Sequence, residues 1–553
     1  MINKIKIYLC QLNFHVGDLN KNLEKIISTR EGVKNKGGDL CIFSELSITV
    51  YPPEDLVLRK SFIYAVENII LKLISLSKDG GPAIIVGYPR NDNNKLKNSA
   101  ALIDNGSISI VDKFHLPNYG VFDEARVFNS ERVSGPLVFK GIRLGLMICE
   151  DMWFSDVAES LQESGAQILI VINGSPFDQN KEDERISVAV SRVVETNLPL
   201  IYVNQIGGQD ELVFDGGSFA LNNNSKLCLQ SSLWVESEDC LELSINNNGL
   251  LDINDSIINK ISNGLESKYN AMVLGLRDYV IKNNFKGVLL GLSGGIDSAL
   301  AAAISVDALG SDKVRGIRMP SQYSSQGSLD DAEETSKLLN IKIDTINIED
   351  INRSYLNNLD SLFAGLANDL TEENIQSRIR GVILMAVSNK FGDMLVSTGN
   401  KSEISVGYTT IYGDMNGGFS ALKDAYKTDV YKLSKWRNIN YNKLYLGPNS
   451  FVVPLNSINK EPSAELNLNQ KDQDSLPPYE VLDEILKNII EDEASLDTII
   501  KLGHDRQLVH RIYRLLLLSE YKRRQSAPGV KLTARSFGKE RRYPITNAFL
   551  RDK

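Results

Sequence analysis

Three residues with reactive side chains each stand at the end of an apolar, strand-like run in the first half of the chain. Glu45 follows LCIFS, Lys113 follows SISIVD and Cys149 follows RLGLMI. Strand ends in α/β folds are where catalytic side chains gather. A free thiol with a pKa near 8.5 is only about 3% thiolate at pH 7, so a nucleophilic cysteine needs a base or a cation beside it. A carboxylate and an ammonium group would supply both, and the cation would also stabilise an oxyanion.

Each of these residues also has an ordinary explanation. A buried cysteine at a strand end commonly only packs, Lys113 alone could be a solvated charge, and Glu45 could be a carboxylate at a helix N-terminus. His115 is the only obvious histidine partner for Cys149, and no acid is evident to orient it. The combination of all three residues favours the catalytic interpretation.

Longer segments around these residues point to a family. In order they are FSELSITVYPPEDL, VDKFHLPNYGVFDE, LMICEDMW and NGSPFDQNKEDER. Together they resemble the nitrilase, or carbon–nitrogen hydrolase, superfamily, most closely its glutamine-hydrolysing members, from residue 1 to about residue 245. The resemblance implies an αββα sandwich in which Glu45 is the general base, Lys113 stabilises the tetrahedral intermediate and Cys149 is the nucleophile. It also implies that Glu124 is the second glutamate of the catalytic group.

The same resemblance implies a glutamine-binding set. Tyr119, Ser175 and Lys181 would contact glutamine, and Arg185 is a weaker candidate. The alternative is that Tyr119 and Ser175 only shape a loop and that Lys181 begins a surface helix. The implied reaction is attack of the thiol on the glutamine carboxamide, release of ammonia and hydrolysis of the glutamyl thioester.

A second chemical signal is GVLLGLSGGIDSAL, from residue 287, which reads as a buried strand, a glycine turn and a helix starting near Asp297 or Ser298. Backbone N–H groups at a helix N-terminus attract phosphate, and glycine lets the backbone come close to it. The Walker motif GxxxxGK[ST] carries a lysine for the β- and γ-phosphates, whereas this stretch has serines and no lysine. Taken alone, a strand–glycine–helix turn is also common without any ligand.

SGGIDS resembles the pyrophosphate loop of the N-type ATP pyrophosphatases, which cleave ATP between the α- and β-phosphates to adenylate an oxygen of their substrate. The resemblance implies an adenine nucleotide alpha hydrolase-like domain with a parallel sheet in α/β/α layers. ATP would be a co-substrate held by the loop and by Thr398, and Asp297 would help to hold Mg²⁺. The loop residues are Gly291, Leu292, Ser293, Gly294, Gly295, Ile296, Asp297 and Ser298.

Three downstream segments distinguish between members of the N-type ATP pyrophosphatase group. They are ENIQSRIRGVILMAVSNKFG, VSTGNKSEISVGYTTIYGDMNGGFSALKD and SEYKRRQSAPGVKLTARSFGKERRYPITN. With the first half, they resemble the glutamine-dependent NAD synthetase family over nearly the whole chain. The resemblance implies that Asn374, Glu403 and Lys522 contact deamido-NAD and that Glu403 shares Mg²⁺ with Asp297. Without these segments, Asn374 would read as a helix-surface amide, and Thr398 and Glu403 as strand-end and helix-start residues.

Residues 521–543 carry eight basic residues and one acid in a chain with a net charge of −9. This local excess suits two polyanions, ATP and a dinucleotide. The family resemblance further implies that Asp424 and Lys427 are plausible neighbours of that site. A solvated tail or a subunit contact is the alternative. Sparse aromatic residues make a nucleic-acid patch a poorer fit.

The implied reaction adenylates the nicotinate carboxylate of deamido-NAD, and ammonia then displaces AMP to give NAD. Ammonium has no lone pair, so we expect a tunnel that carries ammonia between the two sites. The family also implies a homo-oligomer, a dimer or an octamer. Two rival interpretations are a glutamine-dependent ATP pyrophosphatase with another acceptor, such as a purine or tRNA base, and a metabolite-binding or scaffold protein with an inert first half.

These residues must be positioned by at least two domains, because 553 residues exceed a single core. Strand-like and helix-like runs alternate up to about residue 220, and residues 221–262 turn polar and irregular. We therefore predict a glutaminase domain at 1–250, a linker at 251–264 and a synthetase domain at 265–553. In the second domain, strands spaced by helices predict a parallel sheet covered on both faces.

Composition narrows the class of protein further. The negative net charge disfavours nucleic-acid binding by the whole molecule. No apolar run reaches the roughly eighteen residues of a membrane span, and no signal peptide is evident. Five scattered cysteines without a CxxC pair fit a reducing cytoplasm better than a disulfide framework.

Overall fold

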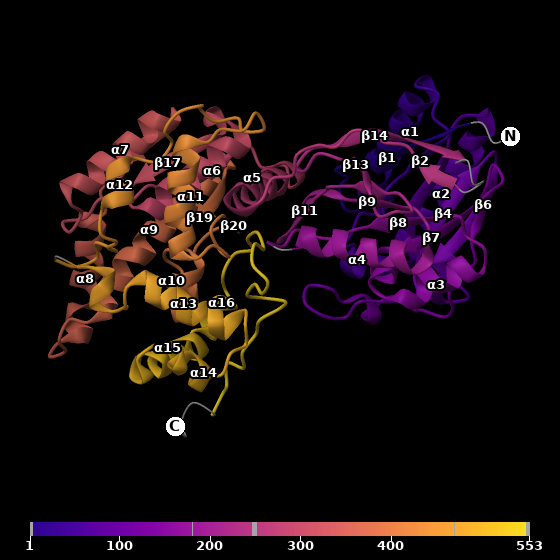
Figure 1. Cartoon of the computed structure of the whole chain (residues 1–553). Helices are drawn as coiled ribbons and strands as arrows, with labels where there is room; N and C mark the ends of the chain where they lie inside the picture. Colours follow the sequence, from indigo (N-terminus) through magenta and orange to yellow (C-terminus); the bar gives the residue numbers. More distant parts are fainter. Residues whose placement is uncertain (1–3, 180, 246–250, 469, 549–553) are drawn as a thin grey trace. The chain divides into compact units, whose positions relative to one another are not determined.

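A computed structural model describes residues 4–179, 181–245, 251–468 and 470–548. The chain forms two compact units: residues up to 209 with 213–263 form the first, and residues 210–212 with those from 264 onward form the second. Each unit is a separate α/β structure (Figure 1). All five cysteines are free thiols. None of the helices in the described ranges is long and apolar enough to cross a membrane.

Two β-sheets stack face to face in the first unit. In spatial order the first sheet contains β15 (Leu251–Ile253), β14 (Ser237–Ile245), β1 (Ile5–Gln11), β2 (Leu40–Ile42), β3 (Ala83–Asp92), β4 (Lys95–Asp104) and β5 (Ser107–Asp112). The second contains β13 (Leu227–Gln230), β12 (Phe219–Leu221), β9 (Leu200–Asn204), β8 (Ile168–Asn173), β7 (Ile142–Ile148) and β6 (Leu137–Phe139). Buried aliphatic side chains from both sheets, such as Ile7 and Ile170, form one core between them. Strands β10 (Ile206–Gln209) and β11 (Leu212–Asp215) pair separately.

Helices cover the outer face of each sheet. Helices α1 (Leu19–Asn35) and α2 (Lys60–Leu76) pack on the first sheet through a second apolar cluster. Helices α3 (Ser155–Glu163) and α4 (Lys181–Thr196) pack on the second sheet, as Figure 1 shows. The predicted αββα sandwich is therefore confirmed.

The predicted irregular stretch at residues 221–262 was wrong. Strand β14 pairs antiparallel with the whole length of β1, from Ile5 opposite Leu243 to Gln11 opposite Ser237, and β15 extends the sheet. Leu241 and Leu243 are buried while the polar residues between them are partly exposed. The period-two pattern of a strand was present, but its polar face dominated the composition.

The second unit is built on a five-stranded parallel sheet, as predicted. In spatial order its strands are β18 (Lys342–Thr345), β17 (Val314–Arg318), β16 (Val288–Gly291), β19 (Met394–Ser397) and β20 (Phe419–Ser420). Strand order reverses between β16 and β19. Open parallel sheets bind ligands at such a reversal, beyond the carboxyl ends of the strands.

The helices of this unit cover the sheet and extend beyond it (Figure 1). Those packed around the sheet are α5 (Gly264–Lys282), α6 (Ile296–Leu309), α7 (Gln326–Leu339), α8 (Glu349–Phe363), α9 (Leu370–Phe391), α11 (Lys427–Ile439) and α12 (Leu455–Asn459). The helix α10 (Lys401–Val406) instead joins an apolar cluster with α13 (Tyr479–Ile490), α14 (Leu496–Lys501) and α15 (Arg506–Leu518). A short helix, α16 (Glu520–Arg523), follows them. The cluster supports α10 from the side away from the sheet.

Candidate active sites

The first site is a buried cluster of one lysine and two glutamates. Lys113 Nζ lies 2.8 Å from Glu45 Oε1 and 2.7 Å from Glu124 Oε1. Glu45 follows β2, Lys113 follows β5 and Glu124 begins the short helix η3 (Glu124–Arg126). The backbone N–H of Gly174 donates to the other carboxylate oxygen of Glu45 at 2.9 Å. The structure therefore brings together three of the four predicted catalytic residues and fixes both oxygens of Glu45.

A glycine in the adjacent strand allows this approach. A Cβ on Gly87 of β3 would lie 2.2 Å from the backbone nitrogen of Leu46 and 3.0 Å from the Cα of Glu45. Any side chain there would push the Glu45 segment off the sheet. Gly87 thus contributes to the site because its lack of a side chain lets the Glu45 segment lie against β3.

Cys149 begins the short helix η4 (Cys149–Trp153), directly after β7. Its φ of 47° lies in the left-handed region, which a non-glycine residue occupies only where the surroundings enforce it. Burial and the nearby charge of Glu45 raise the pKa of Cys149 well above its ordinary value, and Lys113 opposes this shift. The thiol therefore rests in its neutral form and needs a base at the moment of attack.

The two glutamates shift the pKa of Lys113, and Lys113 and Glu45 shift the pKa of Glu124. Burial disfavours the ammonium of Lys113, but Glu124 and Glu45 outweigh that effect and raise its pKa. Burial and the charge of Glu45 raise the pKa of Glu124 to about 7, against the opposing effect of Lys113. Lys113 is therefore a permanent cation, whereas Glu124 titrates near neutrality.

Glu150, which sequence reasoning missed, lies among the predicted glutamine-binding residues. The hydroxyl of Tyr119 donates to its carboxylate at 3.0 Å. Burial raises the pKa of Glu150, and this hydrogen bond and the positive charges of Lys113 and Lys181 oppose the shift. Lys181 begins α4, and its Nζ lies 4.2 Å from the centre of the Trp153 ring. The only signal for Glu150 in the sequence was its position directly after Cys149.

Ser175 lies at a different edge of this site and is held by Arg185. The Nε of Arg185 donates to Ser175 Oγ at 3.1 Å, and an Nη donates to the Ser175 carbonyl at 2.8 Å. Asp215 accepts from Arg185 at 2.8 Å. Arg185 therefore stabilises the segment that presents Ser175.

The second site is a pocket of about 320 Å³ at the carboxyl ends of β16 and β19. The predicted residues in its lining are Gly291, Leu292, Ser293, Gly295, Ile296, Asp297, Ser298, Thr398 and Glu403. Gly294, which belongs to the same loop, has a φ of 82°, and a Cβ there would lie 2.2 Å from the carbonyl oxygen of Ser328. This glycine is required by both its conformation and its close packing.

The loop presents its backbone to the pocket. Helix α6 begins at Ile296 after Gly295, and no side chain caps it in the described part of the chain. Ser293 Oγ accepts from the Gly295 N–H at 3.2 Å and lies 3.2 Å from Ser298 Oγ. An uncapped helix start flanked by two hydroxyl groups is suited to an anionic ligand.

A lysine absent from the loop itself reaches it from α11. Lys427 Nζ contacts the carboxylate of Asp297 and lies 3.2 Å from Glu403 Oε1. Asn400 donates to Asp297 at 2.8 Å and accepts from the Glu403 N–H at 3.0 Å, which caps α10. The loop, α10 and α11 therefore converge on one charged cluster.

The carboxylates of this cluster fit a shared divalent cation. Burial and the charges of Asp297 and Asp472 raise the pKa of Glu403 to about 8, although Lys427 opposes the shift. Within the described residues, no group of three or more acidic, histidine or cysteine side chains is arranged to hold a metal unaided. Mg²⁺ commonly takes one or two carboxylates and completes its shell with phosphate oxygens and water, which Asp297 and Glu403 would permit.

Asn374 and Lys522, predicted to bind the dinucleotide, meet at one loop beside the pocket. Asn374 Oδ1 accepts from the Thr410 hydroxyl at 2.8 Å. Lys522 Nζ donates to the carbonyls of Gly407 and Thr409 at 2.7 and 2.6 Å. Thr409 itself lines the pocket. The two residues therefore border the pocket through the loop of residues 407–410.

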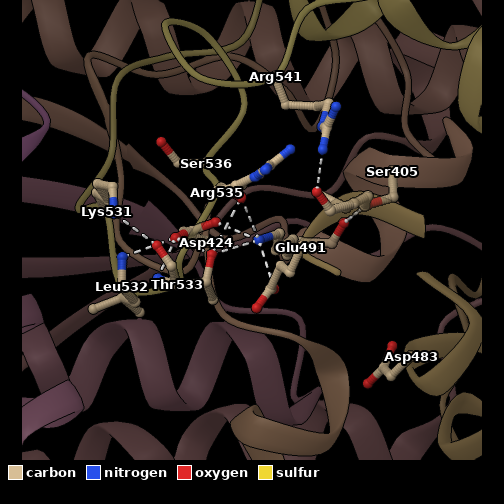
Figure 2. Close-up of polar contacts among 12 residues, drawn as sticks. Ser405, Asp424, Asp483, Glu491, Lys531, Leu532, Thr533, Arg535, Ser536 and Arg541 are labelled. Atoms are coloured by element: carbon tan, nitrogen blue, oxygen red, sulfur yellow. Dashed lines mark hydrogen bonds and ion pairs between the residues drawn. The ribbon is translucent and has the colours of Figure 1, made fainter. Parts of the chain in front are cut away.

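Much of the basic 521–543 segment is used inside the second unit. Asp424 accepts backbone N–H groups of Leu532 and Thr533, each at 2.8 Å (Figure 2). Lys401 lies 2.9 Å from Asp424 and 3.2 Å from Glu491, and its side chain is fully buried. Because Ser526 and Ala527 line the pocket, this anchored segment contributes one of its walls.

Known proteins match both units. Residues 268–526 match the family described as NAD synthase, and residues 6–239 match carbon-nitrogen hydrolase. The sequence is 46% identical over 548 residues, 99% of each chain, to a glutamine-dependent NAD(+) synthetase of Rhodobacter capsulatus. It is 39% identical over 553 residues, 100% of each chain, to the protein of that name from Acinetobacter baylyi. The structure of glutamine-dependent NAD+ synthetase from Acinetobacter baumannii in complex with ADP matches with a TM-score of 0.78 at 38% identity, covering 99% of each chain.

Proposed function

Because the chain belongs to the family of glutamine-dependent NAD(+) synthetases, we propose that its two sites carry the two half-reactions of that family. The family's reaction is the ATP-dependent amidation of deamido-NAD with ammonia from glutamine, and the protein is a ligase. The observation that carries the assignment of residues is the convergence of predicted side chains at the ends of strands in each unit. Glutamine, ATP and deamido-NAD are the proposed substrates.

In the first site, Cys149 attacks the carboxamide carbon of glutamine while Glu45 accepts the thiol proton. The fixed cation of Lys113 stabilises the oxyanion, and Glu124 orients Lys113 through their 2.7 Å contact. Glu45 returns the thiol proton to the leaving nitrogen as the tetrahedral species collapses, which releases ammonia and leaves a glutamyl thioester. Water then hydrolyses the thioester with Glu45 again as the base. Tyr119, Ser175 and Lys181 bind the substrate.

In the second site, the nicotinate carboxylate of deamido-NAD attacks the α-phosphorus of ATP and pyrophosphate leaves. The SGGIDS loop binds that leaving group with its backbone, and Lys427 supplies the positive charge that the loop lacks. Ammonia then attacks the adenylated carboxyl carbon and AMP departs, which forms the carboxamide. Thr398 contacts ATP, and Asn374, Glu403 and Lys522 contact the dinucleotide.

Mg²⁺ is the metal that these residues would hold. Asp297 and Glu403 would be its protein ligands, together with oxygens of the nucleotide. When bound, Mg²⁺ neutralises charge on the leaving pyrophosphate. The contacts of Lys427 support this assignment, because both carboxylates already face one positive charge in the structure.

Two properties of the whole molecule belong to the same proposal. Helix α9 exposes Leu370, Val382, Met385 and Phe391, which supports assembly into a homo-oligomer, a dimer or an octamer. Light scattering of the full chain tests this, and a monomer at micromolar concentration would contradict it. Free thiols throughout support a cytoplasmic location, which fractionation of the source cells tests by showing the protein in the soluble fraction.

The acceptor is tested by substrate-dependent release of pyrophosphate. With ATP, Mg²⁺ and glutamine, we expect release on addition of deamido-NAD and none with xanthosine monophosphate or tRNA. A chelator should stop the release. Release with another acceptor, but not with deamido-NAD, would identify a different amidotransferase of the same fold.

A further inference from the structure

We propose that Asn98 is a positioning residue of the glutaminase site, which holds the general base and the second glutamate through one side-chain amide. This inference rests on the glutaminase function proposed above. Sequence reasoning did not single out Asn98, which lies within the strand-like stretch that forms β4.

The contacts of Asn98 reach three of the proposed catalytic residues. Its Nδ2 donates to Glu45 Oε1 at 2.8 Å and to Glu124 Oε2 at 3.3 Å. Its backbone carbonyl accepts from the N–H of Lys113 at 2.8 Å. The residue is 1% exposed, so water does not compete for these contacts. A single position on β4 therefore connects the two glutamates and the backbone of the lysine between them.

The chemistry of the amide explains why asparagine suits this place. Its NH₂ group has two hydrogens, so it can donate to two carboxylates at once. Aspartate would add a third negative charge to the cluster, and leucine, of similar size, would donate to neither carboxylate. Asn98 Oδ1 is buried without a hydrogen-bond partner among the described residues, which is an unfavourable arrangement. Turning the amide would bring that oxygen against the carboxylates, so the position retains the amide for its two donors.

Hydrogen bonds to a carboxylate favour its ionised form. Asn98 therefore fixes the orientation of the Glu45 carboxylate that accepts the thiol proton, and its second hydrogen bond favours the ionised form of Glu124, which holds Lys113. The charged and titratable groups that face Glu45 are Lys113, Glu124, Cys149, Glu150 and Tyr51. Removing the amide alters the charge of none of them, so a changed pH profile can be traced to the donors that Glu45 and Glu124 lose.

The test compares the pH dependence of glutamine hydrolysis in wild type, Asn98→Leu and Asn98→Ala. We expect kcat/KM for glutamine to fall by about tenfold or more. The acid limb of the profile should move to higher pH, because Glu124 loses one of its hydrogen-bond donors and protonates more readily. Asn98→Ala removes the same donors without adding bulk, so both variants should move the limb in the same direction. Ammonia-dependent NAD synthesis should persist in both.

Ser99→Ala is the matched control. Ser99 is the next residue of β4, is fully buried and donates to Asp112 at 2.6 Å. The Ser99→Ala substitution therefore removes a hydrogen bond of the same strand, and the acid limb of the pH profile should stay in place. A loss of activity in the Asn98 variants without movement of the limb, or no loss at all, would overturn the role of Asn98. Glutamine hydrolysis that is absent from wild type, or independent of Cys149, would instead overturn the proposed glutaminase function.

Discussion

At the scale of single residues, one lysine in the first site forms ion pairs with two glutamates. Lys113 contacts Glu45 at 2.8 Å and Glu124 at 2.7 Å, yet burial and the charge of Glu45 still raise the pKa of Glu124 to about 7. In the proposed mechanism the two carboxylates differ in role: Glu45 accepts the proton of the thiol, and Glu124 holds the lysine. A buried carboxyl with a raised pKa also makes the free energy of unfolding depend on pH.

Glu124→Gln should change how the stability of the first unit depends on pH. Between pH 4.5, the ordinary pKa of a glutamate, and about 7, folded Glu124 keeps a proton that the unfolded chain releases. Its contribution to the free energy of unfolding therefore falls as pH rises through this window. Calorimetry of wild type and variant from pH 5 to 8 should show the melting temperature of the variant rising relative to wild type. A constant difference would contradict the raised pKa.

At the scale of elements, the parts that could be predicted are those in which local pattern and tertiary environment agree. The apolar runs that precede Glu45, Lys113 and Cys149 form β2, β5 and β7, and the predicted strand and helix that flank the glycine turn are β16 and α6. Strand β14 was missed because it is defined by its pairing with β1 more than by its composition. The SGGIDS loop was identifiable from its own residues.

The partners of that loop were harder to predict. Lys427 lies 130 positions from Asp297, and local patterning carries no information about contacts at that separation. Asn98 and Glu150 likewise take part through neighbours that only the folded sheets bring together. The predicted contribution of the 521–543 segment to ligand binding stays a prediction. Figure 2 shows one reason for its position, the contacts of Asp424 with Leu532 and Thr533.

The buried ion pair that anchors this segment should be needed for its order. Burial would raise the pKa of Asp424, but Lys401 and two backbone N–H groups hold it below its ordinary value. Lys401→Met leaves Asp424 and Glu491 without their shared cation, which costs about 3–5 kcal/mol. We expect faster proteolysis after residue 528, a lower urea midpoint of the second unit and loss of NAD synthesis, while glutamine hydrolysis persists.

Lys337→Met is the control for this change. Lys337 pairs with Glu333 on the surface at 3.5 Å with its side chain 71% exposed, so its removal should leave all four measurements unchanged. Equal effects of the two variants would show that the buried ion pairs of Lys401 stabilise the segment no more than an exposed pair does. Loss of glutamine hydrolysis in Lys401→Met would show that its influence extends beyond the second unit.

At the scale of the whole molecule, two chemistries share one chain, as in the full-length relatives that it matches. The first unit makes ammonia and the second consumes it, so the nitrogen source can be changed without changing the acceptor. The expected tunnel for ammonia follows from this pairing of reactions and from the family, and it stays a prediction. The central claim is that the two reactions take place at separate sites. A single substitution should therefore abolish one reaction and leave the other.

Cys149→Ala, assayed for NAD formation with glutamine and then with ammonium salts, tests that claim most directly. Without the thiol no ammonia can be released from glutamine, whereas the loop, Lys427 and the carboxylates of the second site are untouched. Cys228→Ala, another buried thiol of the first unit, should retain synthesis with both sources. We predict that Cys149→Ala loses synthesis with glutamine and retains it with ammonium. Synthesis that persists with glutamine, or that is lost with both sources, would contradict the account.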